Sequence, residues 1–146
     1  MAILVDTNIL IYRIDPRDPA KRDAATETLR RGRVSGELCI PHQSLVEFVN
    51  VVTRSRGGEA SLMTRENATR QVEMFMLQFP VIYPDDGVVR TALRGMAAYR
   101  LPWFDAHLWA YAEHYGMSEL LSEDFEHGRF YGKVRIRNPF LALGLA

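Results

Sequence analysis

The sequence has almost no cysteine and no long apolar run. Its single cysteine, Cys39, stands in an apolar stretch, so the chain of 146 residues cannot form an intramolecular disulfide. A lone cysteine among apolar residues is most simply a buried small side chain, which favours a reducing compartment. No stretch approaches the roughly 18 apolar residues that span a membrane, and the first residues lack the basic and apolar regions of a signal peptide. We therefore expect a cytoplasmic protein without a membrane segment.

The sequence also lacks an excess of charge of either sign. Its 18 basic and 18 acidic residues give a net charge of zero, which argues against a dedicated nucleic-acid binder with a uniformly basic surface. The basic residues nevertheless gather in the first third and near the end of the chain: Lys21, Arg22, Arg30, Arg31 and Arg33, then Arg129, Lys133, Arg135 and Arg137. A neutral sum is therefore compatible with a basic rim around an acidic pocket.

Several common site types are missing. The sequence contains no P-loop and no dinucleotide-binding fingerprint. Cys39 and His42 make half of a zinc-ligand pair, but no second pair has suitable spacing. We also find no Ser–His or Cys–His relay of the kind used in covalent hydrolysis. These nucleotide, zinc and covalent sites are therefore not predicted.

Short apolar segments alternate with longer segments of helical periodicity. The expected strands are residues 2–5, 38–40, 81–83, 119–122 and 133–137, the last an edge strand because charged and apolar residues alternate in it. The expected helices are residues 8–13, 19–31, 41–56, 64–79, 84–99 and 105–116, with Gly32 ending the second. Strands separated by helices predict an α/β fold with a mostly parallel central sheet, helices on both faces, and a single domain over residues 1–146.

In such sheets, sites form beyond the carboxyl ends of the strands, where this chain has Asp6 and the pair Glu123-Asp124. Asp6 is followed by Thr7 and Asn8, and a strand tip can hold the hard oxygen ligands of a metal site rigidly. The alternative is that Asp6 caps the next helix, with Thr7 and Asn8 as turn residues. Spacing alone supports both interpretations equally.

The interpretation of four acids depends on where each lies in its helix or strand. Glu47 lies on a polar helix stripe, and such a stripe is usually only solvated. Asp105 is placed as a first-turn acid that the helix dipole favours, a position that also aims it at the carboxyl edge of the sheet. Consecutive residues at a strand end point in opposite directions, so only one of Glu123 and Asp124 is expected to face a cleft.

Four short motifs, in order, resemble those of the PIN-domain family, and the resemblance covers essentially the whole chain. They are Asp6-Thr7-Asn8, Ser44-Leu45-Val46-Glu47-Phe48, Phe104-Asp105-Ala106-His107-Leu108-Trp109-Ala110 and Leu120-Leu121-Ser122-Glu123-Asp124-Phe125. The segment Val134-Arg135-Ile136-Arg137-Asn138-Pro139-Phe140 is similar to the terminal strand and tail of many bacterial members. The resemblance implies four catalytic, metal-holding acids: Asp6, Glu47, Asp105 and Asp124. Thr7 and Asn8 are expected to support the site, and hydroxyl contacts from Ser122 and Thr7 are expected to support Asp124.

The resemblance also implies an activity and partners. Clustered carboxylates repel one another, and Mg²⁺ or Mn²⁺ would relieve that repulsion. The implied enzyme is a metal-dependent endoribonuclease that leaves a 5′-phosphate. The short single-domain form resembles VapC-type toxins of type II toxin–antitoxin pairs, which implies a small antitoxin and a homodimer. Because attraction to RNA must come from a local basic rim, we take Arg13, Arg54 and Arg129 as candidate RNA contacts.

Three other functions are considered. A receiver-type regulatory module with an acidic Mg²⁺ pocket should carry paired acids before the phosphoacceptor strand and a late Lys, and this sequence does not place them. A phosphatase of the haloacid-dehalogenase type also begins with a strand and an Asp, but it needs a second acid two residues on, where this chain has Asn8. A non-catalytic RNA-binding or protein-interaction domain on the same fold is the other alternative. The complete set of four acids favours catalysis over that alternative.

Overall fold

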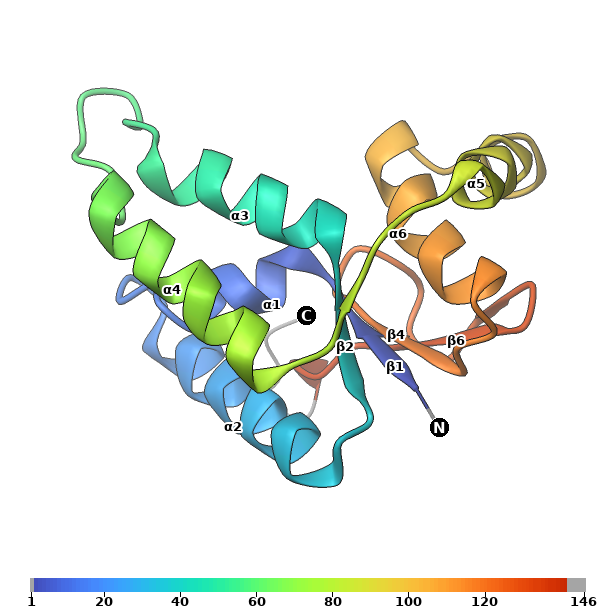
Figure 1. Cartoon of the computed structure of the whole chain (residues 1–146), viewed down its shortest axis with the longest axis horizontal. Coiled ribbons are helices and arrows are strands. Elements are labelled where there is room, and N and C mark those ends of the chain that lie inside the picture. The colour runs from blue at the N-terminus through green and yellow to red at the C-terminus, as the bar shows by residue number, and fades with distance from the viewer. Residues whose placement is uncertain (1, 142–146) are drawn as a thin grey trace.

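The structure is a computed structural model that describes residues 2–141, which form a six-stranded sheet with helices on both faces (Figure 1). The strands are β1 (Ile3–Val5), β2 (Leu38–Pro41), β3 (Val81–Ile82), β4 (Glu119–Leu121), β5 (Phe130–Tyr131) and β6 (Val134–Arg137). Their order in the sheet is β3-β2-β1-β4-β6-β5, and every neighbouring pair is parallel except β5 with β6. The predicted α/β fold with a mostly parallel sheet is confirmed.

Six helices connect or cover the strands: α1 (Thr7–Tyr12), α2 (Pro19–Ser35), α3 (His42–Thr53), α4 (Arg65–Gln78), α5 (Asp86–Tyr99) and α6 (Trp103–His114). Three of them begin at a side chain that accepts a hydrogen bond from a backbone N–H of the first turn, namely Asp18 of α2, Thr64 of α4 and Asp85 of α5. Such caps satisfy one of the unpaired donors at a helix start, which explains why Thr64 and Asp85 marked the starts of α4 and α5 in the sequence.

The central strands are buried on both faces because successive side chains point to opposite sides of the sheet. Val5 and Leu121 pack into a core under α1 to α4, whereas Leu4 and Leu120 pack into a second core under α5 and α6. Figure 1 shows these two groups of helices on opposite sides of the sheet. Burial of apolar surface on both faces therefore fixes the strands whose ends carry the candidate acids.

Two expected helix ends were wrong by three or four residues, and the other helix boundaries differ by two residues or fewer. α2 does not end at Gly32 but continues to Ser35 and stops at Gly36, which has the left-handed backbone (φ 74°) that glycine adopts readily. Gly32 instead allows α2 to approach β2, because a Cβ there would lie 2.5 Å from Cδ1 of Leu38. α3 ends at Thr53 rather than near residue 56, because the backbone of Arg54 is extended (ψ 147°).

The position of the last strand also differs from expectation. The segment expected to be an edge strand is β6, and it lies between β4 and β5. β5 is the outer strand at that side, and its two residues are too few to show a period in the sequence.

Two structural observations bear on the expectations drawn from the cysteine content and from the lack of a long apolar run. The lone Cys39 is buried. Among residues 2–141, no helix combines the length and apolar character needed to cross a membrane.

The order of the strands changes direction beside β1, which makes this position a topological switch point of the sheet. The chain passes from β1 to β2 and β3 on one side, while β4 pairs with the other side of β1. In open parallel sheets, ligands bind beyond the carboxyl ends of the strands at such a point. Asp6 follows β1 directly, and residues 122–124 follow β4, so their side chains lie at this edge.

Candidate functional site

Asp6 is buried at the carboxyl end of β1, with 3% of its surface exposed. It stands at the N-cap of α1, yet its side chain makes no capping hydrogen bond. Instead, the hydroxyl of Ser122 donates to its Oδ2 over 2.6 Å. Burial raises the pKa of Asp6 to about 7; the hydrogen bond from Ser122 opposes this rise, and the charges of Asp124 and Asp105 add to it. The backbone N–H of Asn8 also opposes the rise and is the smallest of these contributions, so helix capping is not the main interaction of this carboxyl.

Asp124 is attached to the same edge from β4. The Oγ of Ser122 accepts a hydrogen bond from the backbone N–H of Asp124 over 3.1 Å, so one hydroxyl contacts two of the acidic residues. The Nδ2 of Asn8 donates to Oδ2 of Asp124 over 3.0 Å. Burial raises the pKa of Asp124, and repulsion from Glu123 adds to the rise. The carboxylate of Asp124 thus faces the chain that follows Asp6.

Glu123 has different partners. Its carboxylate accepts hydrogen bonds from the hydroxyl of Tyr12 and, over 2.8 Å, from Nζ of Lys21. The ammonium of Lys21 also lies 4.8 Å from the centre of the Tyr12 ring. Glu123 therefore has its own hydrogen-bond and ion-pair partners, although its charge and that of Lys21 still act on Asp124.

Glu47 reaches the edge from α3. Its Oε1 lies 3.0 Å from Oγ1 of Thr7, which can donate to it, and 3.2 Å from the donating Nε2 of Gln43. The hydroxyl of Thr7 therefore supports Glu47 and not Asp124, contrary to expectation, because Thr7 begins α1 beside α3. Because Glu47 is half-buried and has two side-chain hydrogen-bond partners, it is not simply a solvated residue of a polar helix stripe.

Asp105 lies in the first turn of α6 and is half-buried. Burial raises its pKa, and the negative charges of Asp124 and Glu47 raise it further. Within residues 2–141, no hydrogen bond or ion pair engages its carboxylate. The Nε2 of Gln43 donates to the carbonyl of Phe104 over 3.0 Å and so joins α3 to α6. Gln43 was not predicted as a site residue; its signal was the spacing of four residues from Glu47 on one helix face.

The four acids come from four elements and act on one another electrostatically. Among residues 2–141, no three Asp, Glu, His or Cys side chains stand close enough to hold one ion as a ready-made cage. Mg²⁺ keeps several of its waters and is usually bound by one or two carboxylates together with substrate phosphate. An all-oxygen set, with the pKa raised at Asp6, Asp105 and Asp124, therefore fits a hydrated divalent cation, since that charge would favour the ionised acids.

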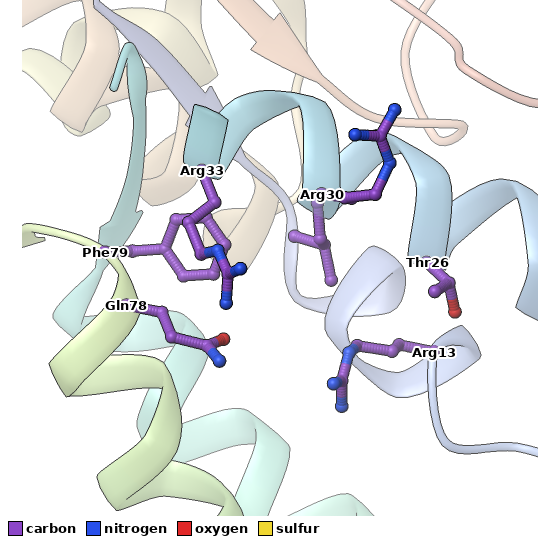
Figure 2. A pocket seen from close by; sticks show the side chains of 7 residues that line it. Arg13, Thr26, Arg30, Arg33, Gln78 and Phe79 are labelled. Carbon is purple, nitrogen blue, oxygen red and sulfur yellow. The ribbon is translucent and has the colours of Figure 1, made fainter. Parts of the chain in front are cut away.

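The three candidate arginines lie in different surroundings. Arg13 lines a groove between α2 and α4 together with Arg30, Arg33 and Phe79, and none of the four acids lines that groove (Figure 2). Arg129 pairs with Glu126 over 3.2 Å and lies 4.3 Å from the centre of the Tyr131 ring. Only Arg54 shares a pocket with Asn8, the residue that contacts Asp124.

Comparisons with known proteins agree with this architecture. The model of the PIN domain family matches residues 3–133. No curated protein matches the sequence significantly.

Solved structures resemble the chain over most of its length. A toxin–antitoxin complex from Klebsiella pneumoniae has a TM-score of 0.69 at 18% identity, covering 94% of this chain and 98% of that one. DNA-bound VapBC from Salmonella typhimurium has a TM-score of 0.69 at 16% identity, covering 95% and 98%. VapC20 of Mycobacterium tuberculosis, a toxin that cleaves the sarcin–ricin loop, has a TM-score of 0.61 at 16% identity, covering 82% and 87%. At these identities the structures show a shared fold, and the family model covers most of the sequence. The chain belongs to the PIN-domain family.

Proposed function

We propose that this PIN-domain protein is a divalent-metal-dependent endoribonuclease. The observation that carries the proposal is the buried Asp6 at the switch point of the sheet, with three further acids acting on it or on each other. Such an excess of negative charge is unfavourable in the protein alone and becomes favourable around a cation that also binds phosphate. Titratable groups with strongly shifted pKa values in one place are typical of functional sites.

Each acid has a distinct task in this proposal. Asp6, fixed by Ser122, and Asp124, fixed by Asn8, would hold hydrated Mg²⁺ or Mn²⁺, and Glu47 and Asp105 would act on its bound waters or on the substrate. When bound, such a cation polarises a phosphoryl group and lowers the pKa of an attacking water. The carboxylate of Asp105 has no hydrogen-bond partner within residues 2–141, so it remains able to orient that water or a substrate oxygen.

The test is incubation of the purified protein with RNA in Mg²⁺, Mn²⁺ or EDTA. We expect cleavage with either metal, none in EDTA, and a loss of at least about a hundredfold in Asp124→Asn, comparable to the loss of one electrostatic catalytic group. The matched control is Glu123→Gln, which changes the adjacent acid and should retain more activity than Asp124→Asn. Equal cleavage in both variants, or cleavage in EDTA, would refute the site assignment.

Absence of cleavage in every metal would instead favour the non-catalytic alternative, an RNA-binding or protein-interaction domain on the same fold. The phosphatase alternative has lost its support. The position where its second acid is needed is Asn8, whose amide donates to Asp124. The family match over residues 3–133 also identifies a different family.

We further propose that the protein is the toxin of a type II pair and is silenced by a small antitoxin. The similar structures include toxin–antitoxin complexes. The groove of Figure 2 supports a partner, because Arg13 and Arg33 line it and form no ion pair within residues 2–141, whereas Arg30 already pairs with Glu27 over 2.7 Å. The guanidinium groups of Arg13 and Arg33 complement an acidic segment.

Growth arrest on induced expression tests the toxin assignment. We expect Asp124→Asn to relieve the arrest, and we expect co-expression of the cognate small protein to relieve it as well. Leu77→Glu places a negative charge on an exposed side chain of α4, the helix that forms one side of the groove. That variant should stay toxic yet escape the partner. An arrest that Asp124→Asn leaves unchanged would contradict the assignment.

A further inference from the structure

A second polar pocket opens beside the acids. It has a volume of about 350 Å³ and lies between α1, the end of α3 and the loops that follow each helix. Its lining residues are Asn8, Ile11, Tyr12, Asp15, Arg17, Val51, Arg54 and Arg56. Asn8 connects the two places, because its side chain lines the pocket and donates to Asp124 over 3.0 Å.

The wall of this pocket carries more positive than negative charge. Its one carboxylate, Asp15, is buried and is held by Arg17 through two hydrogen bonds of 2.8 and 2.6 Å. Hydrogen bonding from Arg17 lowers the pKa of Asp15, so this pair stays ionised and balanced. Arg54 and Arg56 add two further positive charges; Arg56 also acts electrostatically on Asp15, but neither forms an ion pair within residues 2–141. Glu59, which does not line the pocket, interacts electrostatically with Arg17 and does not remove the excess.

The net charge of the whole chain is zero, so the excess of positive charge in this pocket is a local feature of the surface. The basic pocket and the acidic site suit different ligands. Carboxylates bind a cation, whereas guanidinium groups bind phosphate through paired N–H donors. If the reacting phosphate of a polyanion lies at Asp124, the next residue that the polyanion meets is Asn8. The next surface along α1 beyond Asn8 is this pocket. α1 and α3 run side by side away from the sheet edge and form its two sides (Figure 1).

We propose that this pocket binds a backbone phosphate of RNA next to the one that is cut, through Arg54 and Arg56, with Arg17 fixed in place by Asp15. This inference rests on the proposed function, because it takes the acids as the place of cleavage. An acidic protein segment is the competing occupant. RNA is favoured because the pocket is continuous with the acids through Asn8, whereas the arginine groove of Figure 2 contains none of them.

The experiment measures binding separately from cleavage. Short random-sequence single-stranded RNA is titrated into Asp6→Asn protein in EDTA across a salt series. The double variant Arg54→Ala/Arg56→Ala should bind about tenfold more weakly, and its salt slope should shrink by about 0.7 for each phosphate that the protein no longer neutralises. The matched control is Arg90→Ala/Arg94→Ala, which removes the same charge from α5 on the other face of the sheet and should bind unchanged. Arg54→Lys/Arg56→Lys keeps the charge and should restore part of the affinity.

Cleavage by the same double variant in the otherwise unmodified protein should show a raised KM with little change in kcat, as expected for an interaction made equally in the ground and transition states. If the unmodified protein cleaves no RNA but binding depends on Arg54 and Arg56, the proposed function fails and the phosphate pocket stands. If it cleaves RNA and the double variant matches the Arg90/Arg94 control, the pocket fails and the function stands. Loss of an acidic partner's binding without loss of RNA binding would also overturn the proposal.

Discussion

Asp6 is a carboxylic acid held where water barely reaches it, and this has an energetic consequence for the folded protein. Its pKa rises from 3.8 to about 7. A group whose pKa is higher in the folded protein than in the unfolded chain stabilises the fold while it is protonated. For Asp6 this stabilisation is fully present below pH 3.8 and is lost as the pH rises through about 7. The loss amounts to on the order of 4 kcal/mol at most, from about 1.4 kcal/mol for each pKa unit.

Asp6→Asn should remove this pH dependence, because the amide is uncharged and can still accept the hydrogen bond from Ser122. In EDTA at pH 8, we expect the variant to be a few kcal/mol more stable than the unmodified protein, and near pH 4 the two should be similar. Urea unfolding of both proteins across this range measures the difference. Mg²⁺ at pH 8 should stabilise the unmodified protein and have much less effect on the variant. Parallel stability curves for the two proteins would rule this account out.

The acids themselves could be read from the sequence more easily than their partners. Asp6 and Asp124 were visible because each follows an apolar segment at a predicted strand end, and both lie at the expected edge. The contact of Thr7 with Glu47 was not visible, since it depends on how α1 and α3 lie together across 40 residues of sequence. Hydrogen bonds between distant segments follow from packing, which periodicity does not report. The catalytic role of the four acids stays a prediction.

Helix α2 and strand β2 lie closer together than side chains usually allow. The space for a Cβ at Gly32 is taken by Leu38, which is almost fully buried and cannot move aside. Gly32→Ala should therefore destabilise the fold by about 1 to 3 kcal/mol through overpacking, although alanine favours a helix more than glycine does. Thermal unfolding measures this change. Val34→Ala, at an exposed position of the same helix, is the control and should stay within about 0.5 kcal/mol. A neutral Gly32→Ala would show that the two elements can separate at little cost.

Sequence patterns predicted some starts and ends of the helices and strands correctly and others wrongly. The starts of α4 and α5 were readable because Thr64 and Asp85 are capping residues, and the start of α2 because Pro19 suits the first helical position; both are local signals. The end of α2 was misplaced because Gly32 is needed for contact with β2, and a sequence cannot distinguish a glycine used for packing from one used for termination. β5 was missed because a strand of two residues exists only through its pairing with β6.

On the scale of the whole molecule, one surface keeps apolar side chains in water. A shallow hollow formed by α3, α5 and α6 is lined by Val46, Val89, Trp103 and Phe104, and these side chains are 38–65% exposed. Contiguous exposed apolar surface marks an interaction site more often than a free face. We expect this hollow, which Glu47 also lines, to be the contact between two copies of the chain, in agreement with the homodimer that the family resemblance implies.

Sedimentation or light scattering at micromolar concentration should therefore give the mass of a dimer. Val46→Glu/Val89→Glu should shift the protein to monomer, because a charge buried without a partner is costly in an interface. Leu77→Glu, at an exposed apolar side chain on α4, should leave the dimer intact. A monomeric unmodified protein, or a dimer that resists the double variant, would contradict this assignment.

The hydrogen bonds at the acidic edge join segments that are far apart in the sequence. Asp6 with Ser122, and Asn8 with Asp124, are each separated by 116 residues. During translation Asp6 and Asn8 are therefore made long before Ser122 and Asp124. Under the proposed function, a nascent chain that has not yet reached Asp124 lies beside ribosomal and messenger RNA without a complete cutting centre. We expect a product that stops before Ser122 to leave that RNA intact.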